Sequence, residues 1–273
     1  MTRKGLLANK NRIRLASMLS AESADAATRQ ERLHLKTAKQ QIIAIGGGGF
    51  TMEPENPALE LYILAQARRR NPSICFLSTA TGDAATYIAK FYAAFANHRC
   101  RPTHLPLFER TPDLQKLLGA QDVIYVGGGN TKSMLAVWGE WQLPKFLRQA
   151  WKSGTVLAGI SAGAICWFEA GVTDSWAGRL APLRCLGWLP DTCCPHYDGE
   201  KERRPALHKL VARHAVPPAL ALEDGVAAHF VGRKLLRVVS SRPSALAYSV
   251  QSRGGRVTET PLPVVRLSKR SPV

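Results

Sequence analysis

The sequence lacks the features of a membrane-spanning protein, a disulfide-stapled secreted domain or a small metal-held domain. No apolar run approaches the roughly 20 residues that cross a bilayer, and the N-terminus lacks the apolar region of a secretory signal. The six cysteines include no CxxC pair, and several stand in apolar stretches, where a reduced cysteine packs as a small hydrophobe. These absences predict a cytoplasmic protein without disulfides, membrane contact, bound metal or other cofactor.

Acidic residues are also scarce, with 20 Asp and Glu against 37 Lys and Arg and a formal net charge of +17. The excess is spread along the chain, and its dense clusters, at 68–70 and 203–204, are short. No zinc-finger, RRM or basic-zipper pattern accompanies the charge. We therefore expect a solvated basic surface and no specific nucleic-acid partner. Nucleic-acid binding with a steep salt dependence stays open as an alternative.

The chain divides into a short extension and one domain. Residues 1–38 are polar and basic and precede the first strand pattern, which predicts an extension that is flexible or partly helical. Glu22, Asp25 and Glu31 disfavour an organelle transit peptide there. Residues 39–273 are predicted to form a single domain, because a chain of this size with 45% hydrophobic residues can bury a full core.

From residue 41 onward, short β-rich apolar runs alternate with longer amphipathic segments, which is typical of βαβ units. The pattern predicts an α/β fold with a mainly parallel sheet sandwiched by helices. Strands are expected at 41–46, 74–79, 103–108, 123–127 and 155–160, and helices at 57–70, 84–97, 112–118 and 131–151, the last broken at Pro144. After residue 170 one more helix and several short strands predict a C-terminal antiparallel extension of the same sheet.

Ser161 is the candidate nucleophile. It stands in Gly159-Ile160-Ser161-Ala162-Gly163, a G-x-S-x-G pattern at a predicted strand-to-helix junction, as a nucleophile elbow requires. Small neighbours permit the strained turn, and the amide of Ala162 can point at a developing oxyanion. A turn that needs small residues only for packing is the alternative.

A second glycine turn, 127–130, also ends a predicted strand and opens a helix. An amide of Gly128 or Gly129 could supply the other oxyanion donor, and Asn130 is a candidate for substrate contact. A simple tight turn explains the pattern equally well. The glycines at 46–49 lack the G-x-G-x-x-G spacing of a nucleotide-binding turn, so we expect a wall beside a substrate cleft.

His196, held behind Pro195, is the candidate base, because a serine hydroxyl needs an imidazole to take its proton at neutral pH. Cys193 and Cys194 precede it, but adjacent cysteines without a second ligand pair do not favour zinc. The acid that orients His196 is left open between three carboxylates, each of which could instead serve a cap or turn: Asp174, Asp224 and Glu223. The short interval from Ser161 to Asp174 and the 77 residues after His196 disfavour an α/β-hydrolase.

Four segments, IIAIGGGGFTMEPENP, DVIYVGGGNT, GISAGAICWFEAGVTDS and CPHYDGE, resemble the peptidase E group, the S51 serine peptidases. The resemblance covers about residues 40–251 and implies the class I glutamine amidotransferase-like fold. It implies Ser161 as nucleophile, His196 as base, and Asp224 or its neighbour Glu223 as the third member. It further implies Asp174 as an additional aspartate, and Gly128, Gly129 and Ala162 as the oxyanion hole.

The resemblance also bears on the substrate. Aspartyl dipeptidases of this group use an arginine in the helix after the histidine motif, and here Glu202 stands at the aligned position, followed by Arg203 and Arg204 as candidate substrate residues. The resemblance therefore implies specificity for an N-terminal aspartate only if Arg203 or Arg204 takes the place of that arginine. The predicted function is a serine peptidase for short peptides, acting as a monomer or homodimer; the alternative is a non-catalytic amidotransferase-like binding module.

Overall fold

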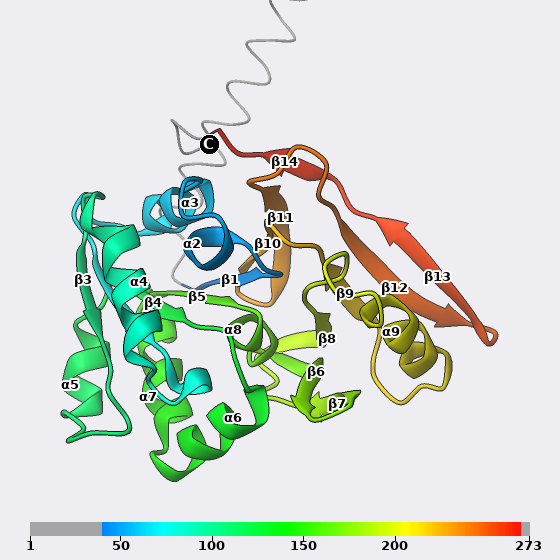
Figure 1. Ribbon diagram of the computed structural model, residues 1–273, viewed down its shortest axis with the longest axis horizontal. Helices are drawn as coiled ribbons and strands as arrows, with labels where there is room; N and C mark the ends of the chain where they lie inside the picture. Colours follow the sequence, from blue (N-terminus) through cyan, green and yellow to red (C-terminus); the bar gives the residue numbers. More distant parts are fainter. Residues whose placement is uncertain (1–39, 269–273) are drawn as a thin grey trace, which may run out of the picture. The chain divides into compact units, whose positions relative to one another are not determined.

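Two β-sheets organise residues 40–268, the part of the chain that the computed structural model describes (Figure 1). The first sheet contains β1 (Gln41–Ile45), β2 (Ser73–Leu77), β3 (Arg101–His104), β4 (Val123–Val126), β5 (Val156–Ile160), β10 (Val226–Val231), β11 (Lys234–Ser240) and β14 (Val264–Arg266). Their order across the sheet is β14-β11-β10-β1-β5-β4-β2-β3. Strands β1, β5, β4, β2 and β3 run parallel, as predicted, but β3 begins two residues before the expected 103–108 and ends at His104.

Helices cover both faces of this sheet, and alternate residues of β1 show which core lies on each face. Ile43 and Ile45 pack with α3 (Ala58–Gln66) and α4 (Ala85–Ala96), whereas Ile42 and Ala44 belong to the core with α5 (Leu114–Gly119), α6 (Thr131–Glu140) and α7 (Leu143–Lys152). Because both faces are covered, β1, β4 and β5 are buried throughout. This explains the unbroken apolar runs in the sequence.

The expected helices are present, with ends that differ from the predicted ones by at most about four residues, the largest difference being at the end of α3. The break in 131–151 falls at Trp141 and Gln142, where Gln142 has a φ of 50°, and Pro144 lies in the first turn of α7. The one-turn helix α2 (Gly49–Met52) was not expected, whereas the helix expected directly after Ser161 is present as a single turn, α8 (Ala162–Ile165).

The C-terminal region corrects one part of the prediction. Strands β10 and β11 do extend the first sheet in antiparallel fashion. The other strands instead build a second sheet of order β13-β12-β9-β8-β6-β7, made of β6 (Phe168–Trp176), β7 (Arg179–Arg184), β8 (Leu189–Cys194), β9 (Ala219–Leu222), β12 (Ala247–Arg253) and β13 (Arg256–Pro261). The single turn of α8 is too short for a crossover, so the chain after it starts a new sheet.

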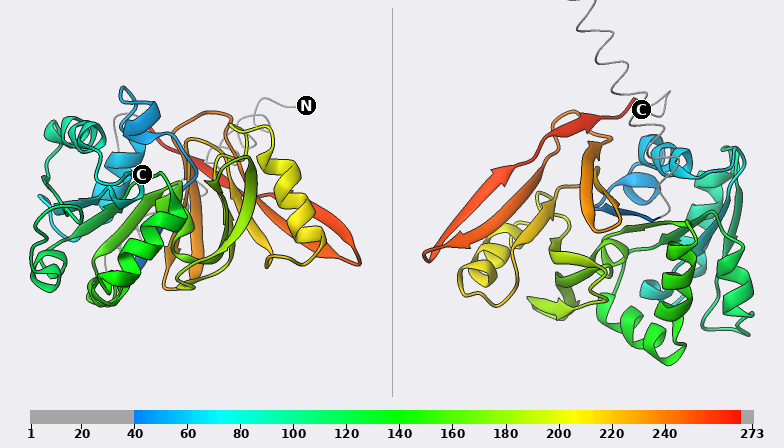
Figure 2. Two further views of the ribbon diagram at one scale, coloured as in Figure 1. Left: turned by 60° about the horizontal axis from the view of Figure 1, so that its bottom comes forward. Right: turned by 180° about the vertical axis from the view of Figure 1, so that it is seen from behind.

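The second sheet is covered by α9 (Arg203–Ala212), which packs on β12, β13 and β7. Figure 2 shows the β12–β13 hairpin at the end of this unit opposite α5, α6 and α7. The prediction of an extension over 1–38 lies outside the described residues, and the predicted division into extension and domain therefore stays a prediction.

The junction between β5 and α8 allows a test of close packing. A β-carbon added at Gly163 would overlap the carbonyl of Val126, whereas one added at Gly139 in α6 meets nothing within 4 Å. We expect Gly163→Ala to lower the free energy of unfolding by about 1–3 kcal/mol through overpacking. Gly139→Ala should raise it by about 0.5–1 kcal/mol, because alanine loses less backbone entropy on folding. Urea denaturation measures both, and equal midpoints would contradict this account.

Candidate active site

Ser161 occupies a strained turn between β5 and α8. Its φ of 55° and ψ of −112° are rare for a residue with a side chain. The Ser161 amide donates to the carbonyl of Ile45 at 3.0 Å, and the amide of Ala164 donates to the Ser161 carbonyl at 2.9 Å. A β-carbon on Gly159 would overlap the Gly163 carbonyl, so the glycines of G-x-S-x-G permit the close approach of helix and strand that this turn requires.

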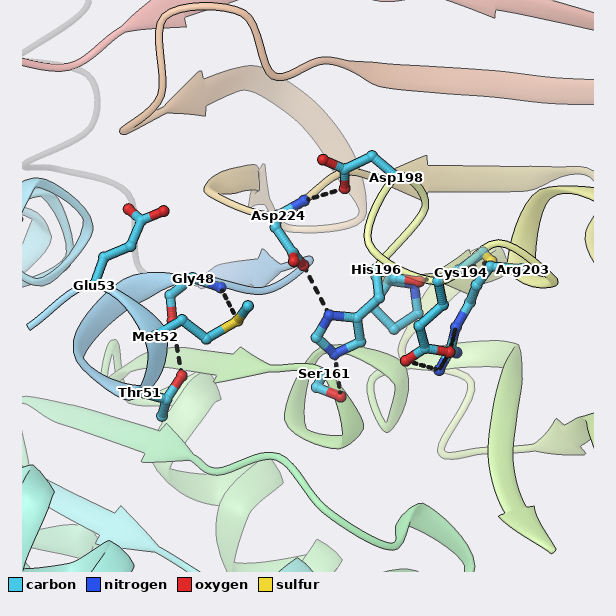
Figure 3. A network of polar contacts seen from close by, with 12 residues as sticks. Gly48, Thr51, Met52, Glu53, Ser161, Cys194, His196, Asp198, Arg203 and Asp224 are labelled. Carbon is cyan, nitrogen blue, oxygen red and sulfur yellow. Dashed lines mark hydrogen bonds and ion pairs between the residues drawn. The ribbon is translucent and has the colours of Figure 1, made fainter. Parts of the chain in front are cut away.

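His196 faces Ser161 from the second sheet. It follows β8 and Pro195, has a φ of 53°, and its Nε2 lies 2.9 Å from the Ser161 Oγ (Figure 3). Its Nδ1 lies 2.7 Å from Oδ1 of Asp224. Since an ionised carboxylate only accepts hydrogen bonds, the Nδ1–H donates to Asp224. In the neutral ring Nε2 is then free to accept the Ser161 hydroxyl proton.

Asp224 lies in the turn between β9 and β10 and is 4% exposed. Burial by itself would raise the pKa of its carboxyl group. The hydrogen bond from His196 and the charges of His196, Arg242 and Arg203 outweigh burial and lower this pKa. The Asp224 amide donates to Oδ1 of Asp198 at 2.8 Å, which fixes the turn. Asp224 is therefore held as a carboxylate against the imidazole.

Of the three predicted oxyanion donors, Gly129 and Ala162 have backbone amides that no described residue accepts a hydrogen bond from. The amide of Gly128 donates to the hydroxyl of Tyr87 at 3.1 Å. Gly128 lies next to Ser161, since a β-carbon on it would lie 3.1 Å from the Ser161 Cβ. The glycine turn thus borders the serine as the sequence predicts, and Gly129 and Ala162 are the better candidate donors.

The glycines at 46–49 do not line the pocket over Ser161, contrary to the expectation of a glycine wall, and they pack instead against the residues that hold Asp224 and His196. A β-carbon on Gly47 would overlap Oδ1 of Asp224 and lie 2.7 Å from Nδ1 of His196. A pocket of about 420 Å³ opens over Ser161. Its lining includes Thr51 and Met52 of α2, Thr81, Tyr87 and Lys90 near α4, and Gly128, Gly129, Ser161 and His196.

Two of the three candidate carboxylates lie elsewhere. Asp174 lies on β6, has a 67% exposed side chain 3.9 Å from the Arg203 guanidinium, and lines a different cavity. Glu223 accepts hydrogen bonds from the Leu246 amide at 2.7 Å and the Tyr248 hydroxyl at 3.1 Å. It anchors β12 to the turn, and neither side chain is brought to Ser161. Asp224 alone contacts His196.

The three residues predicted to contact substrate form hydrogen bonds with other residues of the chain. Asn130 caps α6 by accepting from the Ser133 amide at 2.9 Å and donates to the Ser175 carbonyl at 3.1 Å. Arg203 is 2% exposed; it forms two hydrogen bonds to Glu200, at 2.9 and 3.0 Å, and one to the Val172 carbonyl at 2.9 Å.

Arg204 forms two hydrogen bonds to Glu259, and its guanidinium lies over the rings of both Tyr197 and Tyr248, 4.8 and 5.1 Å from their centroids. None of Asn130, Arg203 and Arg204 lines the pocket over Ser161. The reason is that each is hydrogen-bonded to a residue from another segment of the chain. Glu259, for example, lies 55 residues after Arg204.

The sequence did not single out the pocket residues Thr51, Met52, Tyr87 and Lys90, or Asp198 beside Asp224. The only signal for the first two was their position directly after the glycine run. Residues 40–268 contain no group of three or more His, Cys, Asp or Glu side chains arranged to hold a metal ion. In the same range no helix is long and apolar enough to span a membrane.

Comparison with known proteins shows which family the chain belongs to. The model of peptidase family S51 matches residues 42–238, well over half of the chain. The chain belongs to peptidase family S51. This S51 peptidase is 54% identical over 226 residues to the uncharacterized peptidase YgaJ of Bacillus subtilis (strain 168), an alignment that covers 82% of this chain and 98% of YgaJ. The resemblance to the peptidase E group is thereby confirmed.

Solved structures support the fold. A crystal structure of a peptidase from an acI-B1 Actinobacterium matches with a TM-score of 0.63 at 16% identity, covering 85% of this chain and 97% of the other. A candidate peptidase E of Listeria monocytogenes EGD-e matches with a TM-score of 0.53 at 18% identity, covering 75% and 99%. These matches confirm the α/β architecture and agree with the class I glutamine amidotransferase-like fold.

The lowered pKa of Asp224 predicts how pH affects the stability of this peptidase. A carboxyl group with a lowered pKa in the folded state stabilises the fold above its ordinary pKa, and this contribution is lost as pH falls through the lowered value. Asp224→Asn should therefore cost about 1–3 kcal/mol of unfolding free energy at pH 7, and the difference from wild type should shrink in acid. Urea denaturation between pH 3 and 7 measures this difference.

Asp191 provides a control of opposite sign. Burial, with Glu169 nearby, raises the pKa of the Asp191 carboxyl group. Relative to Asp191→Asn, wild type should lose stability as pH rises through the ordinary pKa of an aspartate to the raised value. A stability difference for Asp224→Asn with the same pH dependence as that for Asp191→Asn would contradict the arrangement described above.

Proposed function

We propose that this S51 peptidase cleaves short peptides through an acyl-enzyme on Ser161. The observation that carries the proposal is the chain of two hydrogen bonds from the Ser161 Oγ through the His196 ring to Asp224, at 2.9 and 2.7 Å. Serine, imidazole and carboxylate in this order are the parts that nucleophilic acyl transfer needs. The pocket over Ser161 gives a peptide access to the hydroxyl.

The reaction follows from the roles of these three groups. His196 Nε2 takes the hydroxyl proton while the Ser161 Oγ bonds to the carbonyl carbon of the scissile peptide bond. Asp224 stabilises the imidazolium that forms, and the imidazolium then gives its proton to the leaving amine as the carbon–nitrogen bond breaks. Water then attacks the acyl carbon while His196 takes a proton from it. The bond from that carbon to the Ser161 Oγ breaks, and the imidazolium gives its proton to Oγ, which releases the carboxyl product and restores Ser161.

The negative charge on the carbonyl oxygen needs donors that are already in place. The amides of Gly129 and Ala162 flank the nucleophile and are not used by the described residues. We assign them as the oxyanion hole, with Gly128 positioning the turn through its bond to Tyr87. Such preorganised donors contribute strongly because they need not reorient during the reaction.

The pocket also suggests which peptides are accepted. Met52 is 52% exposed at its mouth, and Thr51, Thr81 and Tyr87 line it, with Lys90 as a cation and no carboxylate. Since Lys90 is the cation of this pocket and Arg203 and Arg204 are bound by Glu200 and Glu259, we infer that apolar side chains are accepted and positively charged ones disfavoured next to the scissile bond. A cytoplasmic location and a monomeric or homodimeric state stay predictions. A non-catalytic binding module would not require the two hydrogen bonds at His196.

A fluorophosphonate, which phosphonylates activated serines, tests the proposal. We expect wild type to be labelled and Ser161→Ala to remain unlabelled. His196→Ala should react about 10³–10⁴-fold more slowly, because the proton acceptor is lost. Ser133→Ala, which changes an exposed serine on α6, should react like wild type. Mass spectrometry of the labelled peptide gives the site, and equal labelling of wild type and Ser161→Ala would end the proposal.

A further inference from the structure

A buried carboxyl group lies beneath the turn that borders the pocket. Glu60 on α3 is 1% exposed, and its Oε1 accepts a hydrogen bond from the amide of Phe50 in α2 at 2.7 Å. A β-carbon on Gly49 would lie 2.7 Å from Oε1 and 3.9 Å from the Tyr125 hydroxyl. Among the described residues, neither Glu60 Oε2 nor the Tyr125 hydroxyl has a hydrogen-bond partner. The site already described does not use this carboxyl group.

The surroundings of Glu60 are apolar and aromatic. The Phe50 ring lies within 5.6–6.1 Å of five aromatic rings, those of Phe76, Tyr87, Phe91, Phe95 and Tyr125. Burial in this cluster, with a smaller effect of Glu53, raises the pKa of Glu60 to about 7, although the amides of Glu60 and Phe50 act in the opposite direction. The titratable groups that face Glu60 are Glu53, at the end of α2, and Tyr125 on β4; Tyr87 on α4 faces Tyr125 in turn.

The turn above Glu60 is also a wall of the pocket. Thr51 and Met52 line the pocket, and internal hydrogen bonds close the turn: Glu53 amide to Gly49 carbonyl at 2.8 Å and Thr51 hydroxyl to Gly48 carbonyl at 2.8 Å. Figure 3 shows this turn beside His196. One side of α2 thus borders the pocket, while its Phe50 ring and amide are fixed in the core.

We propose that Glu60 is a positioning residue, whose hydrogen bond to the Phe50 amide holds α2 in place so that Thr51 and Met52 shape the pocket for an apolar substituent. This rests on the proposed function of Ser161. Glu60 acts on binding through α2 and does not enter the acyl-transfer steps. Without its acceptor, the buried Phe50 amide would be unsatisfied, which favours conformations in which α2 moves toward water.

The protonation of Glu60 then changes the pocket. The folded arrangement favours the neutral acid form of Glu60, whose pKa is raised to about 7. By linkage, a rise in pH above this value shifts the population toward conformations in which the Glu60 carboxylate is hydrated and α2 is displaced. Affinity for an apolar substituent should fall in the same pH range. A glutamine at this position keeps the acceptor but cannot ionise, so it should remove the pH effect and retain the pocket.

Saturation kinetics with two fluorophosphonates test the proposal on the full chain. One probe carries a decyl chain that fills the pocket over Ser161 along Met52 and Tyr87, and the other carries only an ethyl group. For the decyl probe we expect Glu60→Met to raise the half-saturating concentration about tenfold, with the maximal rate and the ethyl-probe rate within about twofold of wild type. For wild type the half-saturating concentration should rise between pH 6 and 8. For Glu60→Gln it should stay at the wild-type value of pH 6.

Gln66→Met is the matched control. Gln66 lies on the same helix and is buried, and its hydrogen bonds join it to Tyr62, at 2.9 Å, and to Gln41, not to α2. This variant should lower the melting temperature without changing the half-saturating concentration, as expected of a purely structural residue.

Three results would overturn the proposal: an unchanged half-saturating concentration in Glu60→Met, an equal loss of maximal rate with both probes, or a wild-type pH profile in Glu60→Gln. If Glu60→Met does not fold, the pH profile of Glu60→Gln decides. Labelling of Ser161→Ala as fast as wild type would instead refute the proposed function, so the two failures are distinguishable.

Discussion

The site depends on one strained residue. Ser161 has a positive φ that most side chains avoid, and it stays there because the Ile45 carbonyl, the α8 backbone and the close contact of Gly159 with Gly163 leave no room to relax. Backbone strain of this kind costs about 1–3 kcal/mol, and the packing of the surrounding strands offsets this cost. In return, the hydroxyl projects from the end of β5 toward the imidazole, and the Ala162 amide stays free at the same point.

The two sheets divide the work of building the site. The first sheet provides the nucleophile at the end of β5 and the glycine turn at the end of β4, while the second provides His196 at the end of β8. Asp224 lies where the chain leaves β9 of the second sheet and enters β10 of the first. The His196–Asp224 hydrogen bond therefore also joins elements of the two sheets, and Gly47, paired with Asp224 by a β-bridge, closes the same junction.

The sequence was most informative where local pattern and packing agree. Continuous apolar runs predicted the parallel strands because these are buried on both faces, and G-x-S-x-G predicted the elbow because only small residues fit it. Long-range partners had no local signal. Asp224 and Glu223 are adjacent, and only the fold shows that one contacts His196 while the other holds β12. Arg204 resembled a substrate residue until its partner Glu259, on a distant hairpin, was known. The second sheet was missed for the same reason, since its strands find their neighbours across long separations.

The most direct test of the account is a crystal structure of the protein inactivated by a fluorophosphonate. Phosphorus bonded to the Ser161 Oγ takes the place of the carbonyl carbon under attack, and its non-bridging oxygen stands for the oxyanion. The account predicts that this oxygen lies about 3 Å from the amides of both Gly129 and Ala162, with His196 still bonded to Asp224. Phosphorus bonded to any other residue, or an oxygen turned away from both amides, would contradict it.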